Sequence, residues 1–357
     1  MNTMWAVFKR VRVTCRSMLL GGLLFCSCNQ DPIFYGISLE VEPVDPRLVG
    51  MPTRIVAVED SLYVASKFSS AIHCYEGASG WKEVPKRPGG AILELAATET
   101  QLYALTGEPG STALYALSVS DTNADWKQIT SNYGNIQSIY GAGDRLFAGA
   151  MIDTSTFGMF YDNAGKLEAL SGGSGFLQGA AVYAGTYYLA GTGIYSLEGT
   201  SLTLVSDTAG ITVVGLLQVG DGILGVGDGK ILYGPSGGFT VEDKGVTFTG
   251  ALALWGKKGK EAKTLLLLGI QGSSTSTTHG YRELVLKEDS LDPGDMSLKT
   301  PGNNPEASSI SNYDKYSSSL GKHPVMALFQ APDGILFAGT TKNGLWSYRN
   351  EQWNAEP

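Results

Sequence analysis

The sequence has few of the residues that build metal-binding and nucleophilic sites. Its 357 residues include 3 His and 4 Cys, and His73, His279 and His323 are too widely spaced for a zinc site, which gathers four ligands of these types. They are also the candidate bases for a serine nucleophile in Gly234–Gly238, which has the spacing of a nucleophile elbow but no expected helix after it. We therefore expect no metal, no cofactor and no catalytic residues.

Long helical patterns are also scarce. The 47 Gly residues fall mostly between short apolar runs, where turns with positive φ favour glycine, and few stretches are long enough for an amphipathic helix. Gly220–Gly225 has the glycine spacing of a dinucleotide-binding loop. It is followed by a second turn, Gly227–Gly229, and not by the helix that would hold a pyrophosphate. The sequence thus predicts an all-β fold without a nucleotide site.

Residues 1–27 have the pattern of a secretory signal. Four basic residues and no acidic ones precede the apolar core Ser17–Phe25, which at nine residues is too short to span a bilayer as a helix. We therefore expect this segment to be removed and not to form part of the fold.

Leu23–Cys28 resembles the lipobox of bacterial lipoproteins, in which a small residue precedes the cysteine that is diacylated. Cys28 fits this role because Ser27 precedes it, whereas Cys26 follows the bulky Phe25. With Cys28 as the lipidated residue, Phe25 and Cys26 stand where the usual pattern has Leu and a small residue. In these two departures the segment resembles the relaxed lipoboxes of spirochaetes. The resemblance implies a membrane anchor of acyl chains on Cys28 without a transmembrane helix. The alternative is an ordinary secretory signal with coincidental cysteines.

Removal of residues 1–27 leaves an acidic protein. The segment holds 4 of the 26 Lys and Arg and none of the 34 Asp and Glu, which leaves 22 basic against 34 acidic residues and a net charge of −12. This charge argues against nucleic acid as a partner and against docking on anionic lipid through a basic face. Cys74 is then the one cysteine neither removed nor lipidated. We expect no internal disulfide and interpret Cys74 as a small buried apolar residue.

One short pattern recurs seven times: two large residues, a small or β-branched residue, and then in most copies Ala or Gly. Successive copies are 36 to 44 residues apart, except that the last follows after 70. A period of about 40 residues made of strands and turns indicates four-stranded propeller blades. A β-sandwich does not repeat one four-strand pattern in this way, and a β-helix repeats at a shorter period. We predict a seven-bladed β-propeller of four-stranded antiparallel blades. The copies are Leu62–Ala65, Leu102–Leu105, Leu146–Gly149, Tyr188–Gly191, Leu224–Gly227, Leu266–Gly269 and Leu336–Gly339.

The expected propeller covers residues 51–357, preceded by a lipid anchor and tether at 28–50. Ile33–Val41 is predicted to pair with or near the last blade, which has few residues for its outermost strand. The sixth blade has no clear fourth strand. Residues 287–323 are rich in Ser, Asn, Pro, Asp and Gly, so they are expected to form an exposed insertion, with or without a function.

Glu94 lies in an expected innermost strand, where its side chain can face the central channel. A glycan-cleaving site needs several converging carboxylates or an arginine cluster. Besides Glu94, the innermost strands offer Arg54, Gln137, Gln178 and Gln218. We interpret Glu94 as a solvated or hydrogen-bonded channel residue.

Asp333–Thr340 with Gly344–Trp346 resembles the repeat of two-component-regulator propellers: Asp-Gly, an apolar strand ending in Gly-Thr, then Gly-Leu and an aromatic residue. The likeness is good over this blade and degenerate over the other six. It implies a periplasmic sensing or binding module. Lipidated propellers also resemble the scaffold lipoprotein of the outer-membrane β-barrel assembly machine, a likeness of architecture and anchoring.

Together these observations predict a bacterial cell-envelope lipoprotein, on the periplasmic face or the cell surface, whose propeller binds a protein or a glycan and is not an enzyme. The alternatives are a propeller enzyme of sialidase or glycosidase type and an assembly scaffold for outer-membrane proteins. Clustered carboxylates at the channel mouth would favour an enzyme, and an exposed apolar patch on a loop face would favour a protein partner.

Overall fold

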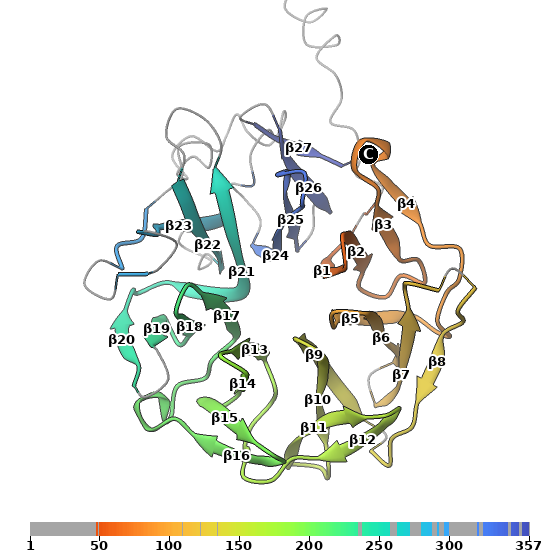
Figure 1. Ribbon diagram of the computed structural model, residues 1–357, viewed down its shortest axis with the longest axis horizontal. Helices are drawn as coiled ribbons and strands as arrows, with labels where there is room; N and C mark the ends of the chain where they lie inside the picture. The colour runs from red at the N-terminus through yellow and green to blue at the C-terminus, as the bar shows by residue number, and fades with distance from the viewer. Residues whose placement is uncertain are drawn as a thin grey trace, which may run out of the picture. The chain divides into compact units, whose positions relative to one another are not determined.

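The structure, a computed structural model, confirms the predicted all-β propeller. It describes residues 48, 50–108, 110–121, 123–133, 135–234, 238–257, 263–271, 280–287, 291–292, 296–299, 320, 324–341, 344–349 and 352–356. All of them lie in one compact unit, Asp45–Pro357. In this unit seven antiparallel sheets follow one another around a central channel (Figure 1). Over the described residues, no helix is long and apolar enough to cross a membrane.

Each sheet is built from consecutive strands, and its first strand lies innermost (Figure 1). The seven innermost strands are short apolar runs and lie beside one another around the channel. They are β1 (Pro52–Val58), β5 (Ile92–Ala97), β9 (Ile136–Ala142), β13 (Gly179–Tyr183), β17 (Gly215–Val219), β21 (Thr247–Lys257) and β24 (Val325–Gln330).

The second strand of each blade contains the repeated pattern and is almost fully buried, because both of its faces pack against neighbouring sheets. These strands are β2 (Ser61–Ser66), β6 (Gln101–Glu108), β10 (Arg145–Met151), β14 (Thr186–Ala190), β18 (Gly222–Gly227), β22 (Lys263–Gln271) and β25 (Leu336–Thr340). The third strands are β3 (His73–Tyr75), β7 (Ser111–Ser118), β11 (Phe157–Asn163), β15 (Ile194–Glu198), β19 (Lys230–Gly234), β23 (Gly280–Val285) and β26 (Leu345–Arg349).

Six of the seven sheets have a fourth, outermost strand within the described residues. The sixth sheet has three strands, as its sequence indicates. The seventh sheet is completed by its own C-terminal residues. The predicted strand Ile33–Val41 lies outside the described residues. The outermost strands are β4 (Trp81–Glu83), β8 (Lys127–Ile129), β12 (Lys166–Ala169), β16 (Ser201–Leu204), β20 (Thr240–Asp243) and β27 (Gln352–Ala355).

Part of the insertion predicted at 287–323 is buried and not exposed. Leu291, Met296 and Leu320 are at most 3% exposed and belong to the apolar core. Lys299 exchanges two backbone hydrogen bonds with Glu283 of β23, of 2.8 and 2.9 Å, and so pairs where a fourth strand would lie. The expectation of an exposed insertion is wrong for these residues, because isolated apolar residues in a polar stretch cover the open edge of the sixth sheet.

The core consists of one apolar cluster at each junction between neighbouring sheets. The described residues contain seven such clusters, and each draws its side chains from two adjacent blades. The ring closes where Phe337 of the seventh blade packs against Tyr75 and Trp81 of the first, with ring centroids 4.9 and 5.1 Å apart. The Tyr75 hydroxyl also donates a hydrogen bond of 2.8 Å to Asp333.

Backbones approach very closely between the second and third blades. A Cβ atom at Gly141 of β9 would lie 1.6 Å from the carbonyl oxygen of Ala97 in β5, so only glycine fits there. At Gly256 of β21 the nearest atom would be 3.8 Å away. The channel wall is therefore tight at Gly141 and has room at Gly256, although β21 also approaches its neighbour closely at Gly250, where a Cβ atom would lie 2.2 Å from the carbonyl oxygen of Val214.

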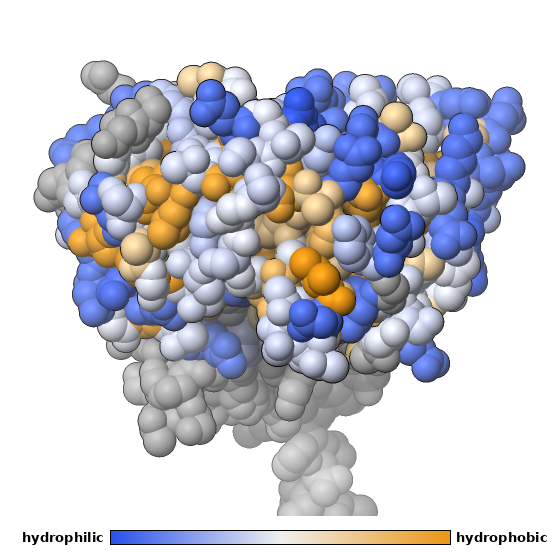
Figure 2. All heavy atoms as spheres, turned by 90° about the horizontal axis from the view of Figure 1, so that it is seen from below, coloured by the Kyte–Doolittle hydropathy of each residue, from blue (hydrophilic) through white to orange (hydrophobic). Residues whose placement is uncertain are grey.

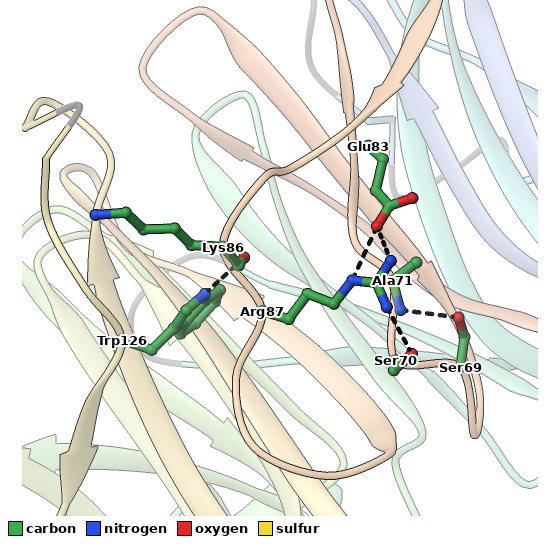
Figure 3. Close-up of polar contacts among 7 residues, drawn as sticks. All are labelled: Ser69, Ser70, Ala71, Glu83, Lys86, Arg87 and Trp126. Atoms are coloured by element: carbon green, nitrogen blue, oxygen red, sulfur yellow. Dashed lines mark hydrogen bonds and ion pairs between the residues drawn. The ribbon is translucent and has the colours of Figure 1, made fainter.

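The segment between the first and second blades is held by polar contacts (Figure 3). The Trp126 indole donates a hydrogen bond of 3.1 Å to the carbonyl of Lys86, and Arg87 pairs with Glu83 of β4. The Lys86 ammonium also forms an ion pair of 2.9 Å with Asp125. These contacts tie the chain leaving the first blade to the outer part of the second.

Candidate functional site

The loop face of the ring is the end at which the innermost strands begin and the hairpins between second and third strands turn. A cavity of about 600 Å³, here called the mouth cavity, opens on this face. Its lining comes from the starts of four innermost strands and from the β2–β3 and β6–β7 hairpins, so it lies over the first, second, third and seventh blades. The lining residues are Met51, Lys67, Phe68, Leu93, Glu94, Gly110, Thr112, Asn135, Ile136, Gln137 and Met326.

Phe68 is the most prominent residue at the mouth cavity. Its side chain is 60% exposed, the largest fraction among the large hydrophobic residues described. Its φ of 67° is in the left-handed region, which a bulky residue rarely adopts. The surrounding structure holds this strained conformation: the Phe68 amide donates 2.7 Å to the carbonyl of Ile92, and the Ile92 amide donates 2.7 Å to Ser69. The β2–β3 hairpin is thereby fixed to the second blade.

Three consecutive blades meet behind the mouth cavity through one polar cluster. The Arg54 guanidinium of β1 pairs with the Glu94 carboxylate of β5 at 2.7 Å and lies 3.6 Å from the ring centroid of Tyr140 in β9. The second Glu94 oxygen accepts a hydrogen bond of 2.7 Å from the Ile139 amide, and Arg54 donates to the Ile139 carbonyl. The prediction of a hydrogen-bonded Glu94 in the channel is confirmed.

Burial dominates the protonation of this cluster. It raises the pKa of Glu94, although the charge of Arg54 and the amide of Ile139 each lower it. Burial likewise raises the pKa of Tyr140 to about 12, so its phenol stays protonated. The side chains of Arg54 and Glu94 are 21% and 19% exposed, so they are reached from the channel but are largely engaged with each other.

The channel itself contains a second cavity of about 500 Å³, which shares Glu94 and Met326 with the mouth cavity. Its charged lining residues are Arg54 and Glu94, and Gln178 and Gln271 add amides. The mouth and channel cavities together are lined by one carboxylate from the described residues. A glycosidase uses two.

A third cavity of about 370 Å³ lies on the rim between the first and second blades and is lined in part by Tyr63 and Cys74. Cys74 is partly buried, less than the sequence suggested, and is not in a disulfide. Burial raises the pKa of its thiol, which favours the protonated form over the nucleophilic thiolate. The rim elsewhere is mixed: Figure 2, seen from the side of β12 and β16, shows hydrophobic residues in separate groups among hydrophilic ones.

The other sequence motifs are not brought together into a site. Gly220–Gly225 forms a turn and the start of β18, and no helix follows. His73 lies in β3, whereas His279, His323 and the centre of Gly234–Gly238 are outside the described residues. No group of three or more His, Cys, Asp or Glu among the described residues is placed to hold a metal ion. The lipidation candidate Cys28 also lies outside them.

The sequence interpretation missed Lys67 and Phe68. They follow directly on the repeated pattern of the first blade, Leu62–Ala65, after a single serine. The signal was an aromatic residue at the hairpin where a turn residue is expected. Recognising it required knowing that this hairpin reaches the channel mouth.

Comparison with known proteins supports the fold. No protein-family model and no curated protein matches the sequence. Solved structures do match. The WD40 β-propeller domain of Doa1 has a TM-score of 0.56 at 13% identity, with 87% of this chain and 96% of that chain covered. The extracellular domain assigned to a hybrid two-component system of B. thetaiotaomicron has a TM-score of 0.54 at 12% identity, covering 88% of this chain and 39% of that one.

A catalytically inactive virginiamycin B lyase from Staphylococcus aureus, crystallised with quinupristin, has a TM-score of 0.53 at 11% identity, with 88% and 98% of the two chains covered. A WD40 domain, a two-component-system domain and a lyase thus share this architecture. At such identities the likeness establishes a seven-bladed propeller and does not select a function.

Proposed function

We propose that this chain is a bacterial envelope lipoprotein, anchored through Cys28, whose propeller is a non-enzymatic binding module for a protein partner. The observation that carries the proposal is the mouth cavity, with the exposed Phe68 fixed beside it on a hairpin tied to two blades. An aromatic side chain on a fixed backbone at the edge of a preformed cavity is typical of binding hot spots, because little backbone entropy is lost on association.

The chemistry of the cavities supports binding over catalysis. Glu94 is engaged by Arg54 and by the Ile139 amide, so it is poorly placed to transfer a proton to a substrate. A single engaged carboxylate favours the binding module over the glycan-cleaving alternative. The scaffold for outer-membrane protein assembly remains a special case of the same proposal, with a different partner.

The binding function is tested by capture from envelope extract with the tagged full chain in detergent, read by mass spectrometry. We expect a specific partner with the wild type and its loss with Phe68→Ser. Ile152→Ser is the matched control, because Ile152 is 52% exposed on a hairpin of the same face but does not line the cavity. Equal capture by all three proteins would place the interface elsewhere. Hydrolysis of a glycan substrate by the purified chain would instead support the glycan-cleaving enzyme and reject the non-enzymatic binding module.

The anchor is tested separately. Cys28→Ala should abolish the acyl-modified N-terminal peptide in mass spectra and move the protein to the aqueous phase in detergent partitioning. Cys26→Ala should change neither. Loss of the acyl group in Cys26→Ala but not in Cys28→Ala would assign the lipid to Cys26. A wild-type protein without any acyl group would show that residues 1–27 are an ordinary secretory signal.

A further inference from the structure

From the charges at the mouth cavity we infer that it binds an acidic peptide segment, with a carboxylate held at Lys67 and adjacent apolar side chains against the cavity wall. This inference deepens the proposed function and rests on it. It goes beyond it in naming the chemistry of the partner and the residue that selects it.

The mouth and channel have an excess of positive charge in an otherwise acidic protein. The charged residues that line the two cavities are Arg54, Lys67 and Glu94. Both oxygens of Glu94 are occupied, one by Arg54 and one by the Ile139 amide. Among the described residues no carboxylate lies within 4.0 Å of the Lys67 ammonium, although its charge reaches Glu94 and lowers the pKa of that carboxyl. The protein without residues 1–27 has a net charge of −12, so a positive group on it attracts anionic ligands locally, whereas the rest of its surface repels them.

Lys67 is positioned for this role by its backbone. Its amide donates a hydrogen bond of 2.9 Å to the carbonyl of Met51, and the next residue, Phe68, is fixed to Ile92. The Lys67 nitrogen lies 5.5 Å from the centre of the Phe68 ring, so a cation and an aromatic face are presented together at the edge of the cavity. A ligand that pairs with the ammonium therefore also contacts the ring.

The remaining lining indicates a peptide. Met51, Leu93 and Met326 give an apolar wall in which the flexible methionine side chains can adapt to another apolar side chain. Gln137 is exposed, and its side-chain amide makes no hydrogen bond within the described protein, so it can donate to and accept from a peptide group. The hydroxyl groups of a glycan would be left unpaired against the apolar wall, at a cost in free energy.

The test uses the full chain in detergent and an array of hexapeptides with acetylated and amidated ends. Each peptide consists of Leu, Phe and Ala except at one position, which holds Glu, Gln or Lys. Binding is measured by fluorescence anisotropy at low and high salt. We expect the best Glu peptides to bind about tenfold more tightly than their Gln partners, since a hydrogen bond to a charged group is at stake. High salt should reduce this ratio. The Lys67→Glu variant should lose its affinity for the Glu peptides and bind the Lys peptides more tightly than the wild type does.

Lys127→Glu on β8 is the matched control, because Lys127 is exposed on the rim, away from the cavities; its binding and melting temperature should match those of the wild type. Equal affinity for Glu and Gln peptides, or an unchanged preference in Lys67→Glu, would overturn the inference. Binding of an acidic glycan with the same dependence on Lys67, without any bound peptide, would also overturn it. Envelope partners captured equally by wild type and Lys67→Glu would reject the acidic preference and leave the binding module standing.

Discussion

Every junction has an apolar cluster, but the first three blades and the last two differ in the contacts added to it. Behind the mouth cavity, Arg54, Glu94 and Tyr140 link three innermost strands through charge and hydrogen bonds. Between the sixth and seventh blades, aromatic rings provide the contact: Tyr281 lies 5.9 Å from Trp353, which lies 5.4 Å from Tyr348. Burying charged groups adds little net stability, whereas burying aromatic area adds much. The first three blades thus add polar groups that a ligand can reach, whereas the junction of the sixth and seventh blades adds buried aromatic contacts.

The aromatic junction should give the largest loss of stability. Trp353 is fully buried, so Trp353→Ala removes apolar contacts and leaves a cavity between two blades. We expect the free energy of unfolding to fall by about 3–5 kcal/mol, measured by urea denaturation. Trp126→Ala is the control, because this indole is partly exposed and makes one hydrogen bond to Lys86. Equal losses in the two variants would contradict the contrast between the two sides of the ring.

The tight packing of the second and third blades should be the next most sensitive feature. Gly141→Ala places a methyl group on the Ala97 carbonyl and forces two strands apart, so we expect a loss of about 1–3 kcal/mol. Gly256→Ala has room for the added atom and restricts the unfolded chain, so its effect should be neutral or slightly stabilising. Thermal unfolding of the two variants measures the difference. Similar melting temperatures would show that the channel wall yields at both places.

The charged cluster should make stability depend on pH. Because burial raises the pKa of Glu94 in the folded protein, the unfolded chain releases this proton first, and stability falls as the pH rises from the ordinary value of 4.5 through the folded pKa. Glu94→Gln removes this dependence. Relative to the wild type, the Glu94→Gln protein should therefore be more stable at pH 7 than at low pH. Arg54→Met should be less stable than wild type at pH 7. The opposite result is a stability difference between Glu94→Gln and the wild type that favours the variant less at pH 7 than at pH 4. It would mean that the pKa of Glu94 is lowered in the folded protein and not raised.

Phe68 should matter least for stability. Phe68→Gly loses little buried surface and relieves the strain of a φ of 67°. The free energy of unfolding should therefore stay the same or rise by up to about 1 kcal/mol, and the melting temperature should change in the same direction. Capture of the envelope partner should be lost in the same variant. A large drop in stability would mean that Phe68 is retained for packing, and the contrast between a binding side and a stabilising side of the ring would fail.

The fold was accessible from sequence because each blade carries its own local pattern. Leu62–Ala65 and its six counterparts alternate with turns at a nearly constant period, and burial of the second strand forces that composition. The three-stranded sixth sheet was recognised for the same reason. Leu291 and Met296 were not, since single apolar residues in a polar stretch carry no periodicity and acquire their role from an open sheet edge nearby.

The site was less accessible. Glu94 could be placed in the channel from its strand, but its pairing with Arg54 joins different blades and depends on how far each strand is shifted along the channel. The same applies to Phe68, which belongs to the first blade yet is hydrogen-bonded to Ile92 of the second. Such contacts between blades are determined by packing, and they produce no regular residue spacing in the sequence.

The closing contact between Tyr75 and Asp333 has a consequence for the order of folding. These residues are 258 positions apart, whereas the other blade junctions join neighbouring segments of chain. Each blade can therefore fold against its predecessor as soon as both have been synthesised, and the loop that closes last is the longest. Until Asp333 and Phe337 have emerged, the first blade exposes the side of Tyr75 and Trp81 to solvent. Until the ring closes, this exposed aromatic surface would make the unfinished chain prone to aggregate.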